Sequence, residues 1–317
     1  MARVLVTRRL TPGGTDPLLE AGHEVVASED DLPLTSAELE AGAAGHEGMV
    51  CLLTDRIDAA VLRAGRDGGR LRVVATASVG YDNIDVAMAR TLGLAVCHTP
   101  GVLDATTADL AFLLILTATR GTTGAEADLR AGRWSGWGFG THLAHDVSGA
   151  TLGLVGYGRI ARVVARRAAG FDMEVLHTSR LDTGRPGYVA TLRELLERSD
   201  IVSLHVPLTE STRHLIGAAE LALMKPTAVL VNTARGPVVD EDALVDALEA
   251  GRLGGAGLDV YDGEPTVNPR LLAAPRLTLL PHIGSATIGT RTEMARLACR
   301  GVVDVLAGRV PPNLVTD

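Results

Sequence analysis

A glycine-rich segment in the middle of the chain constrains the fold more than any other feature. It reads Gly156-Tyr157-Gly158-Arg159-Ile160-Ala161, and it follows an apolar run, Thr151–Val155, and opens a helical pattern. A dinucleotide pyrophosphate requires such glycines because it must approach backbone N–H groups where a Cβ would block it, and the dipole of the next helix favours its negative charge. Most dinucleotide folds begin with this loop. Here 150 residues precede Thr151, so the front of the chain must build a second domain.

Short β-rich runs alternate with helical patterns throughout, which predicts parallel sheets with helices on both faces. The expected strands are Val4–Thr7, Glu24–Ala27, Gly48–Leu53, Arg72–Ala75 and Ala95–Cys97, then Thr151–Val155, Glu174–Thr178, Ile201–Leu204, Ala228–Asn232, Gly255–Leu258 and Leu277–Leu280. We predict an α/β protein with two doubly wound parallel-sheet domains. A Rossmann cofactor domain, residues 102–285, is inserted into a discontinuous flavodoxin-like substrate domain, residues 1–101 plus 286–317. A chain that returns in this way would place its last helix, Thr287–Leu306, on the first sheet.

Composition narrows the class of protein. The chain's 317 residues suit two domains, and its hydrophobic content of 46%, with 3% aromatic, suits two aliphatic cores. The formal net charge of −8 argues against nucleic acid or an anionic membrane as partner. The longest apolar run, Leu110–Leu116, is far shorter than the roughly 20 residues that span a bilayer. Cys51, Cys97 and Cys299 have neither disulfide nor metal-ligand spacing, which fits a reducing compartment, so we expect a cytoplasmic protein.

The end of the second strand after the glycine loop predicts which dinucleotide binds. About 20 residues after the glycines, an NAD-binding domain places Asp or Glu on the ribose 2′-hydroxyl. This chain has Ser179 and Arg180 there instead, a pair that suits a 2′-phosphate through charge-assisted hydrogen bonds. We therefore expect NADP(H) in preference to NAD(H). NAD(H) stays possible because Asp182 follows two residues later and could turn inward. The alternative for Arg180 is a solvated loop charge.

Polar clusters follow the last three expected strands, and in a parallel sheet such strand ends converge on one crevice. Arg235, Glu264 and His282 stand in these clusters. Beside a nicotinamide, His282 would protonate a carbonyl oxygen, and Glu264 would hold the imidazole and stabilise its charged form. Arg235 would bind a substrate carboxylate and polarise the carbonyl. Such a site needs no metal, because Arg235 and His282 supply the electrophilic help.

These clusters, together with Ala77–Asp85, resemble the D-isomer-specific 2-hydroxyacid dehydrogenases, and within them the glyoxylate/hydroxypyruvate reductases. The stretches Arg133–Trp137, Thr178–Arg180 and Pro281–Thr287 carry the closer likeness. Two features depart from the family pattern: Ala161 replaces the more usual glycine, and the glycine-rich arm at residues 132–140 is short. The short arm leaves the substrate preference open.

The resemblance implies further roles. The cofactor would contact Thr107, Gly156, Tyr157, Gly158, Arg159, Ile160, Ser179, Arg180, His205, Val206, Pro207, Thr212, Thr233, Ala234, Asp259, Gly284 and Ser285, with Asp259 accepting from the nicotinamide carboxamide. The substrate would meet Leu53, Val79 and Gly80 besides Arg235 and His282. A helix cap at Thr54 or Asp55 is an alternative explanation of the loop at Leu53. The helix Leu103–Thr119 and an arm, Thr122–Leu143, would form a homodimer interface, and Trp137 would reach the partner's pocket.

The expected function is therefore reduction of a small 2-oxo acid, glyoxylate or hydroxypyruvate, by NADPH to glycolate or a D-2-hydroxy acid. An NAD-dependent D-lactate or D-3-phosphoglycerate dehydrogenase of the same family is the main alternative. The latter usually carries an extra regulatory domain. A nucleotide-sensing binding protein, like the corepressors of this fold, is disfavoured because the full Arg, Glu and His set indicates turnover.

Overall fold

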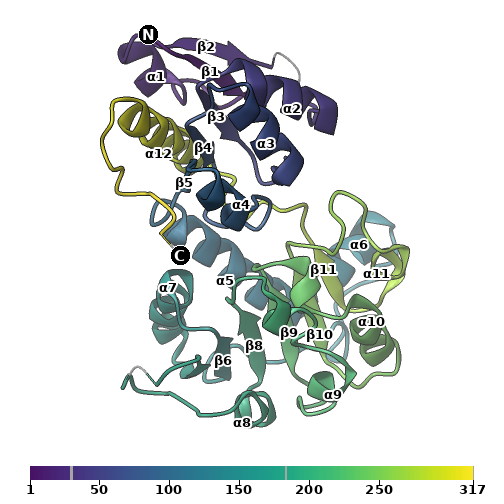
Figure 1. The fold of residues 1–317 in the computed structure, drawn as a ribbon. Helices are drawn as coiled ribbons and strands as arrows, with labels where there is room; N and C mark the ends of the chain where they lie inside the picture. The colour runs from purple at the N-terminus through teal and green to yellow at the C-terminus, as the bar shows by residue number, and fades with distance from the viewer. Residues whose placement is uncertain (29–30, 183, 317) are drawn as a thin grey trace. The chain divides into compact units, whose positions relative to one another are not determined.

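The computed structural model describes residues 1–28, 31–182 and 184–316. Its chain divides into two compact units, Met1–Leu103 with Ser285–Asp317, and Asp104–Gly284 (Figure 1). Each unit is built on a parallel sheet, which confirms the predicted fold class. Among the described residues, no helix is both long and apolar enough to cross a membrane.

The first unit holds five parallel strands in the order β2-β1-β3-β4-β5, the flavodoxin-like order. The strands are β1 (Arg3–Val6), β2 (Glu24–Ala27), β3 (Gly48–Cys51), β4 (Val73–Thr76) and β5 (Ala95–Cys97). The helices are α1 (Asp16–Glu20), α2 (Ser36–Gly45), α3 (Ala59–Asp67), α4 (Val86–Thr91) and α12 (Ile288–Leu306). The central strands β3 and β4 are buried along their whole length because helices cover both faces of the sheet.

The chain's last helix completes this first unit. Side chains of α2, α3 and α4 share one core with one face of the sheet, while those of α1 and α12 share a second core with the other face. Thr287 caps α12, its hydroxyl accepting from Thr290 N. Gly48 on β3 lets α12 approach, since a Cβ there would lie 2.8 Å from Val302 Cγ1. The last helix therefore packs on the first sheet, as the sequence predicts.

The second unit holds six parallel strands in the order β11-β10-β9-β8-β6-β7. These are β6 (Thr151–Val155), β7 (Glu174–Thr178), β8 (Ile201–Leu204), β9 (Val229–Asn232), β10 (Gly255–Leu258) and β11 (Leu277–Leu279). A parallel bridge between His177 and Tyr188 extends the sheet beyond β7. Counting that bridge as a short third strand, the sheet has the Rossmann order, with the switch point between β6 and β8.

Helices cover both faces of this second sheet. Helices α5 (Asp104–Arg120) and α7 (Arg159–Ala168) pack on one face, and α8 (Leu192–Arg198), α9 (Ala218–Leu221), α10 (Glu241–Glu249) and α11 (Pro269–Ala273) contribute to the core of the other. Short 3₁₀ turns lie at Ala169–Phe171, Glu210–Thr212 and Gly236–Val238.

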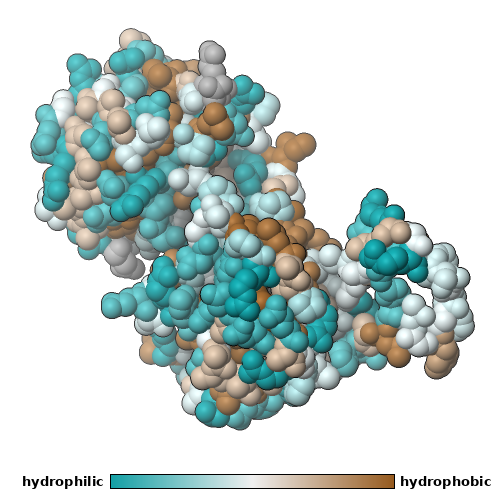
Figure 2. Space-filling view, turned by 90° about the vertical axis from the view of Figure 1, so that its right-hand side faces the viewer, coloured by the Kyte–Doolittle hydropathy of each residue, from teal (hydrophilic) through white to brown (hydrophobic). Residues whose placement is uncertain are grey.

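Part of the predicted arm is helical. Helix α6 (Thr122–Arg130) has no buried residue, and the segment after it exposes Trp134, Trp137, Phe139 and Leu143. Figure 2 shows hydrophobic side chains, in brown, exposed among hydrophilic ones on this face of the molecule. A single exposed apolar residue is ordinary, but four within ten residues, with the rings of Trp137 and Phe139 in contact, are typical of an interface.

Candidate active site

The glycine loop between β6 and α7 leaves room for a ligand. Gly156 has φ +87°, and a Cβ there would lie 2.7 Å from His205 O, so only glycine fits without a shift of the backbone. A Cβ on Gly158 would meet no atom within 4 Å. No side chain caps the N-terminus of α7, so its first N–H groups are free to bind an anion. The loop therefore fits the pyrophosphate of a dinucleotide.

Ala161 belongs to the close contact between α7 and the sheet. It is fully buried in the core that contains Leu152, Leu154 and Val164. A small residue is sufficient here because this position serves helix–strand packing. The departure from glycine leaves the loop intact.

The tip of β7 carries polar groups and no carboxylate in the place of the usual ribose ligand. Ser179 Oγ donates to Leu181 O at 2.6 Å, and Arg180 is exposed. Asp182 Oδ1 accepts from Gly184 N at 2.7 Å, so in this structure the carboxylate stabilises its own turn.

The segment after β8 is held by local hydrogen bonds. His205 Nε2 lies 2.9 Å from Ser203 Oγ, and burial lowers the pKa of His205 to about 4. Its imidazole is therefore neutral at physiological pH. Thr212 Oγ1 donates to Pro207 O at 2.6 Å and accepts from Thr209 N at 2.8 Å. These bonds fix the loop that the resemblance assigns to the adenosine side.

The structure brings Glu264 and His282 together as the sequence predicts. His282 Nδ1 lies 2.6 Å from Glu264 Oε2, and Glu264 Oε1 accepts from Tyr261 N at 2.9 Å. Burial favours the neutral acid, but the hydrogen bond and charge of His282, the Tyr261 N–H and the charge of Arg235 outweigh it, so the pKa of Glu264 is lowered. Because Glu264 is a carboxylate, Nδ1 carries a proton and Nε2 is the ring nitrogen left to act on a substrate.

Arg235 stands directly after a rigid turn at the end of β9. Buried Asn232 donates from Nδ2 to Arg235 O at 2.8 Å, and its Oδ1 accepts from Ala234 N at 3.0 Å. Arg235 Nη1 donates to Ala234 O at 2.8 Å. Thr233 Oγ1 is buried and has no hydrogen-bond partner among the described residues, so it is available to a ligand beside Arg235.

Buried side chains connect the three segments that carry the catalytic candidates. Asp259 is 1% exposed, and its two oxygens accept from Ile283 N and Gly284 N, each at 2.8 Å. Burial raises the pKa of Asp259, although these N–H groups oppose the shift. In this structure Asp259 therefore stabilises the segment of His282. Thr107 lies beside Gly284, since its Oγ1 would be 3.7 Å from a Cβ placed there.

Two further hydrogen bonds and one close backbone approach hold these segments together. Glu241, at the start of α10, accepts from Asp262 N at 2.7 Å, and the Tyr261 hydroxyl lies 2.7 Å from Leu280 O. A Cβ on Gly236 would lie 1.8 Å from Tyr261 C, so the Arg235 segment packs directly against the Glu264 segment. Burial raises the pKa of Glu241. Asn232 and Tyr261 lie in the polar clusters after the strands but were not expected to belong to the site, and Glu241 lies outside those clusters, at the start of α10.

In the first unit, the loops with the expected substrate contacts are tied to each other. Asn83 Nδ2 donates to Leu52 O at 3.0 Å and to Asp55 O at 2.9 Å, which joins the loop of Leu53 to the loop of Val79 and Gly80. Asp55 is buried, and its Oδ2 accepts from Leu52 N at 2.8 Å. The alternative of a helix cap at Thr54 or Asp55 is wrong, because Asp58 caps α3.

Comparisons with known proteins agree with this geometry. A family model described as D-isomer specific 2-hydroxyacid dehydrogenase, NAD binding domain, matches residues 112–284. A glyoxylate reductase from Thermococcus gammatolerans is 43% identical, over 99% of this chain and 95% of its own length. A solved structure from Thermus thermophilus matches with a TM-score of 0.93 at 45% identity, covering 99% of this chain and 100% of that one. An NADPH-dependent glyoxylate/hydroxypyruvate reductase from Sinorhizobium meliloti, in complex with NADP and malonate, matches with a TM-score of 0.86 at 33% identity, covering 99% and 96%.

A dinucleotide cradle and a carboxylate–histidine pair on one Rossmann sheet define an NAD(P)-dependent oxidoreductase. The chain belongs to the D-isomer specific 2-hydroxyacid dehydrogenase family, which confirms the resemblance seen in its sequence. Among the described residues, no group of three or more His, Cys, Asp or Glu side chains is arranged to hold a metal ion.

Proposed function

We propose that this enzyme reduces a small 2-oxo acid, glyoxylate or hydroxypyruvate, with NADPH as the preferred reductant. The observation that carries the proposal is the 2.6 Å contact between Glu264 and His282, on the same sheet as the open glycine loop. Support also comes from the glyoxylate reductases that are 40–44% identical to this chain.

In this mechanism each side chain of the site has a defined role. Arg235 binds the substrate carboxylate through its guanidinium and polarises the carbonyl. His282, charged and held by Glu264, donates the proton from Nε2 to the carbonyl oxygen. When bound, the nicotinamide supplies the hydride that the carbonyl carbon receives. The C=O group thus gains one hydride and one proton and becomes CH–OH, and His282 is left neutral.

The residues around the cradle would hold the cofactor. The Gly156–Ile160 loop would take the pyrophosphate, and Ser179 with Arg180 would take a 2′-phosphate. Thr233, with its unpartnered buried hydroxyl, would contact the nicotinamide half together with Thr107 and Asp259. Val79 and Gly80 would bind the substrate carboxylate through their backbone N–H groups, and Leu53 would belong to a loop on the substrate side.

A second copy of the chain would cover the apolar patch of Trp134, Trp137, Phe139 and Leu143. We infer a homodimer built on α5 and the arm, in which Trp137 reaches the partner's substrate pocket. Sedimentation at micromolar concentration should give twice the mass of one chain. A monomer would contradict this assignment.

The proposed function is tested by a steady-state grid of NADH and NADPH against glyoxylate, hydroxypyruvate, pyruvate and phenylpyruvate. We expect the highest kcat/KM for NADPH with one of the first two acids. Turnover confined to pyruvate or phenylpyruvate would refute the substrate assignment. A higher kcat/KM for NADH would refute the cofactor preference alone.

A further inference from the structure

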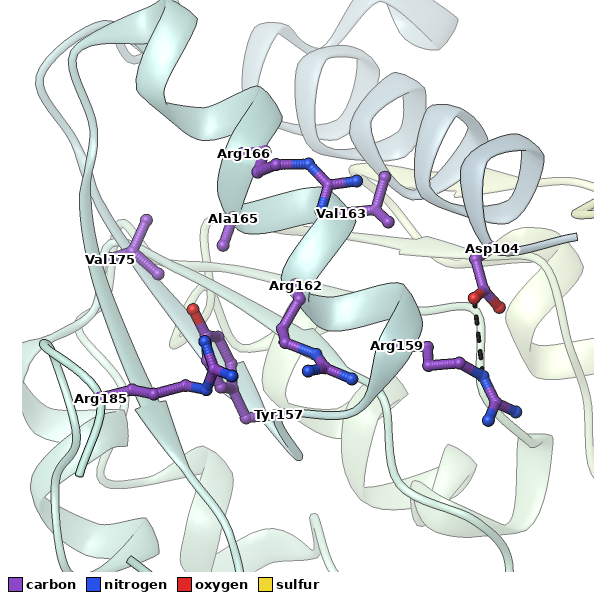
Figure 3. A pocket seen from close by; sticks show the side chains of 9 residues that line it. All are labelled: Asp104, Tyr157, Arg159, Arg162, Val163, Ala165, Arg166, Val175 and Arg185. Carbon is purple, nitrogen blue, oxygen red and sulfur yellow. Dashed lines mark ion pairs between the residues drawn. The ribbon is translucent and has the colours of Figure 1, made fainter. Parts of the chain in front are cut away.

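The two units offer different groups to an anion. In the second unit, four arginine side chains line a hollow beside the glycine loop (Figure 3); they are Arg159, Arg162, Arg166 and Arg185. In the first unit, the loop after β4, residues 78–81, has no charged side chain. An anion at this loop depends on backbone N–H groups, whose directions follow from the orientation of each peptide plane. The contacts that fix those planes therefore decide what the loop can bind.

Two successive N–H groups of this loop, those of Val79 and Gly80, donate to no acceptor among the described residues. The carbonyl groups beside them are all bonded. Ser78 O accepts from Thr99 N at 2.8 Å, and Gly80 O accepts from Ser78 Oγ at 2.5 Å. Val79 O lies 2.9 Å from His98 Nδ1. The loop thus turns its carbonyl groups to the protein and leaves two N–H donors without a protein acceptor.

His98 controls the direction of one of these two donors. In a trans peptide, the C=O of one residue and the N–H of the next lie in one plane and point in opposite directions. The bond between His98 and Val79 O therefore sets the direction of the Gly80 N–H group. A carbonyl oxygen only accepts, so Nδ1 of His98 carries a proton. No other donor among the described residues reaches Val79 O.

His98 is itself held by its ring and by its backbone. The ring meets that of Tyr81 edge-on, with centroids 5.3 Å apart and planes at 88°. The backbone N donates to Asn313 O at 3.1 Å, and the backbone O accepts from Asn313 Nδ2 at 2.8 Å. Asn313 is 3% exposed and also donates to Leu297 O on α12 at 3.2 Å. The segment after α12 thus fixes the residue whose imidazole fixes the loop.

We propose that His98 is a positioning residue for the substrate carboxylate, because its Nδ1–H holds Val79 O and so directs the Gly80 N–H group to the ligand. The inference rests on the proposed function, which assigns the substrate carboxylate to Val79 and Gly80. Reduction changes the charge at the carbonyl and leaves the carboxylate as it is. The bond therefore acts equally on bound substrate and transition state, and its loss should raise KM without lowering kcat.

The test compares His98→Leu, which removes the donor, with His98→Asn, which keeps an N–H group at the equivalent position of the side chain. We expect His98→Leu to raise KM for glyoxylate about tenfold with kcat within about twofold, and His98→Asn to keep both within about threefold. His46→Leu is the matched control, because His46 Nδ1 lies 2.8 Å from Gly42 O in the same unit. It should change KM by no more than about twofold. A cooperative thermal transition will show that each variant is folded.

A second measurement needs no turnover. Oxamate has the carboxylate of a 2-oxo acid, but its carbonyl belongs to an amide and is not reduced. In calorimetric titrations of protein saturated with NADPH, oxamate should bind to His98→Leu about tenfold more weakly than to the wild type. The affinity for NADPH alone should change by less than about twofold in every variant.

Wild-type KM and oxamate affinity in His98→Leu would overturn the proposal, as would an equal rise of KM in His46→Leu or a wild type that does not bind oxamate. Equal impairment of His98→Asn and His98→Leu would also overturn it, because the bond to Val79 O would not be the cause. Failure of the wild type to reduce glyoxylate and hydroxypyruvate with either coenzyme would instead refute the proposed function, and the oxamate titrations would still test His98.

Discussion

The two halves of the Rossmann sheet differ in the segments that follow their strands. We call the half with β9, β10 and β11 the braced end, and the half with β6 and β7 the open end. The segments after β9, β10 and β11 are connected by buried side chains, with Asp259 bonded to the His282 segment and Glu241 to the Glu264 segment. The segments after β6 and β7 depend instead on glycines, on local turns and on exposed arginines. The first arrangement holds each segment by hydrogen bonds to buried groups, and a proton donor requires such exact positioning. The second presents charge on exposed side chains, which is sufficient to recognise a phosphate.

The largest expected effect tests the braced end. His282→Ala should lower kcat by roughly 10²–10⁴, the usual contribution of a positioned general acid. The binding of NADPH, measured by fluorescence titration, should change little. His145→Ala, at an exposed position, is the control. A kcat near that of the wild type would remove His282 from the mechanism.

Asp259→Asn tests whether the hydrogen bonds that Asp259 accepts stabilise the fold as well as the catalytic geometry. Asn offers one acceptor oxygen for two backbone donors, and its NH₂ group would face an N–H that the carboxylate now accepts. We expect the free energy of unfolding to fall by about 2 kcal/mol, the scale of a lost charged hydrogen bond, and kcat to fall at least about tenfold. Urea unfolding and steady-state kinetics measure the two effects. A loss of kcat at unchanged stability would indicate that Asp259 acts on the cofactor alone.

Arg180→Ala tests the open end, where the effect should be selective. Loss of the guanidinium should raise KM for NADPH about tenfold and leave KM for NADH nearly unchanged, because only NADPH carries the 2′-phosphate. The exposed Arg193→Ala, on α8, is the control. Equal effects on both coenzymes would contradict the phosphate assignment.

The sequence predicted the parts of this molecule that depend on local pattern. Strand β10, for example, was expected at Gly255–Leu258 and lies there, because a strand buried on both faces is a short continuous run of small and apolar residues. The Glu264–His282 pair was predictable because the topology of a parallel sheet brings strand ends together. The fold class and the candidate pair thus follow from periodicity and topology.

Contacts that depend on side-chain direction were not predictable in this way. Nothing in the spacing of Glu241 shows that its carboxylate accepts from Asp262 N, and nothing in the helical pattern of α7 shows that Arg162 turns back to Gly158. A helix cap at Thr54 or Asp55 was a reasonable alternative for the Leu53 loop because Thr54, Asp55 and Asp58 all have capping side chains, but Asp58 is the residue that caps α3. Only the fold shows that Asp55 is buried and bonded elsewhere.

Glu241 gives a graded test of the braced end. Gln keeps an acceptor for Asp262 N, whereas Ala leaves that N–H without its partner. We expect Glu241→Ala to lower kcat about fivefold to tenfold and Glu241→Gln to lower it less than about twofold. A structural brace acts through Glu264, so the acid limb of the pH–rate profile should also shift in the Ala variant. Identical kinetics in both variants would show that the contact does not position Glu264.

The smallest expected effect concerns His205, a partly buried group in the segment after β8. Its pKa is lowered by burial to about 4 from an ordinary value of 6.5. Between these values the unfolded chain binds a proton that the folded chain does not, so stability falls as pH falls through this window. The slope is at most about 1.4 kcal/mol per pH unit for one proton. His205→Gln, which can keep the bond to Ser203, should lose this part of the slope and match the wild type above pH 7. A variant that keeps the full slope would show that His205 does not carry this pH dependence and that its pKa is not lowered in the folded protein.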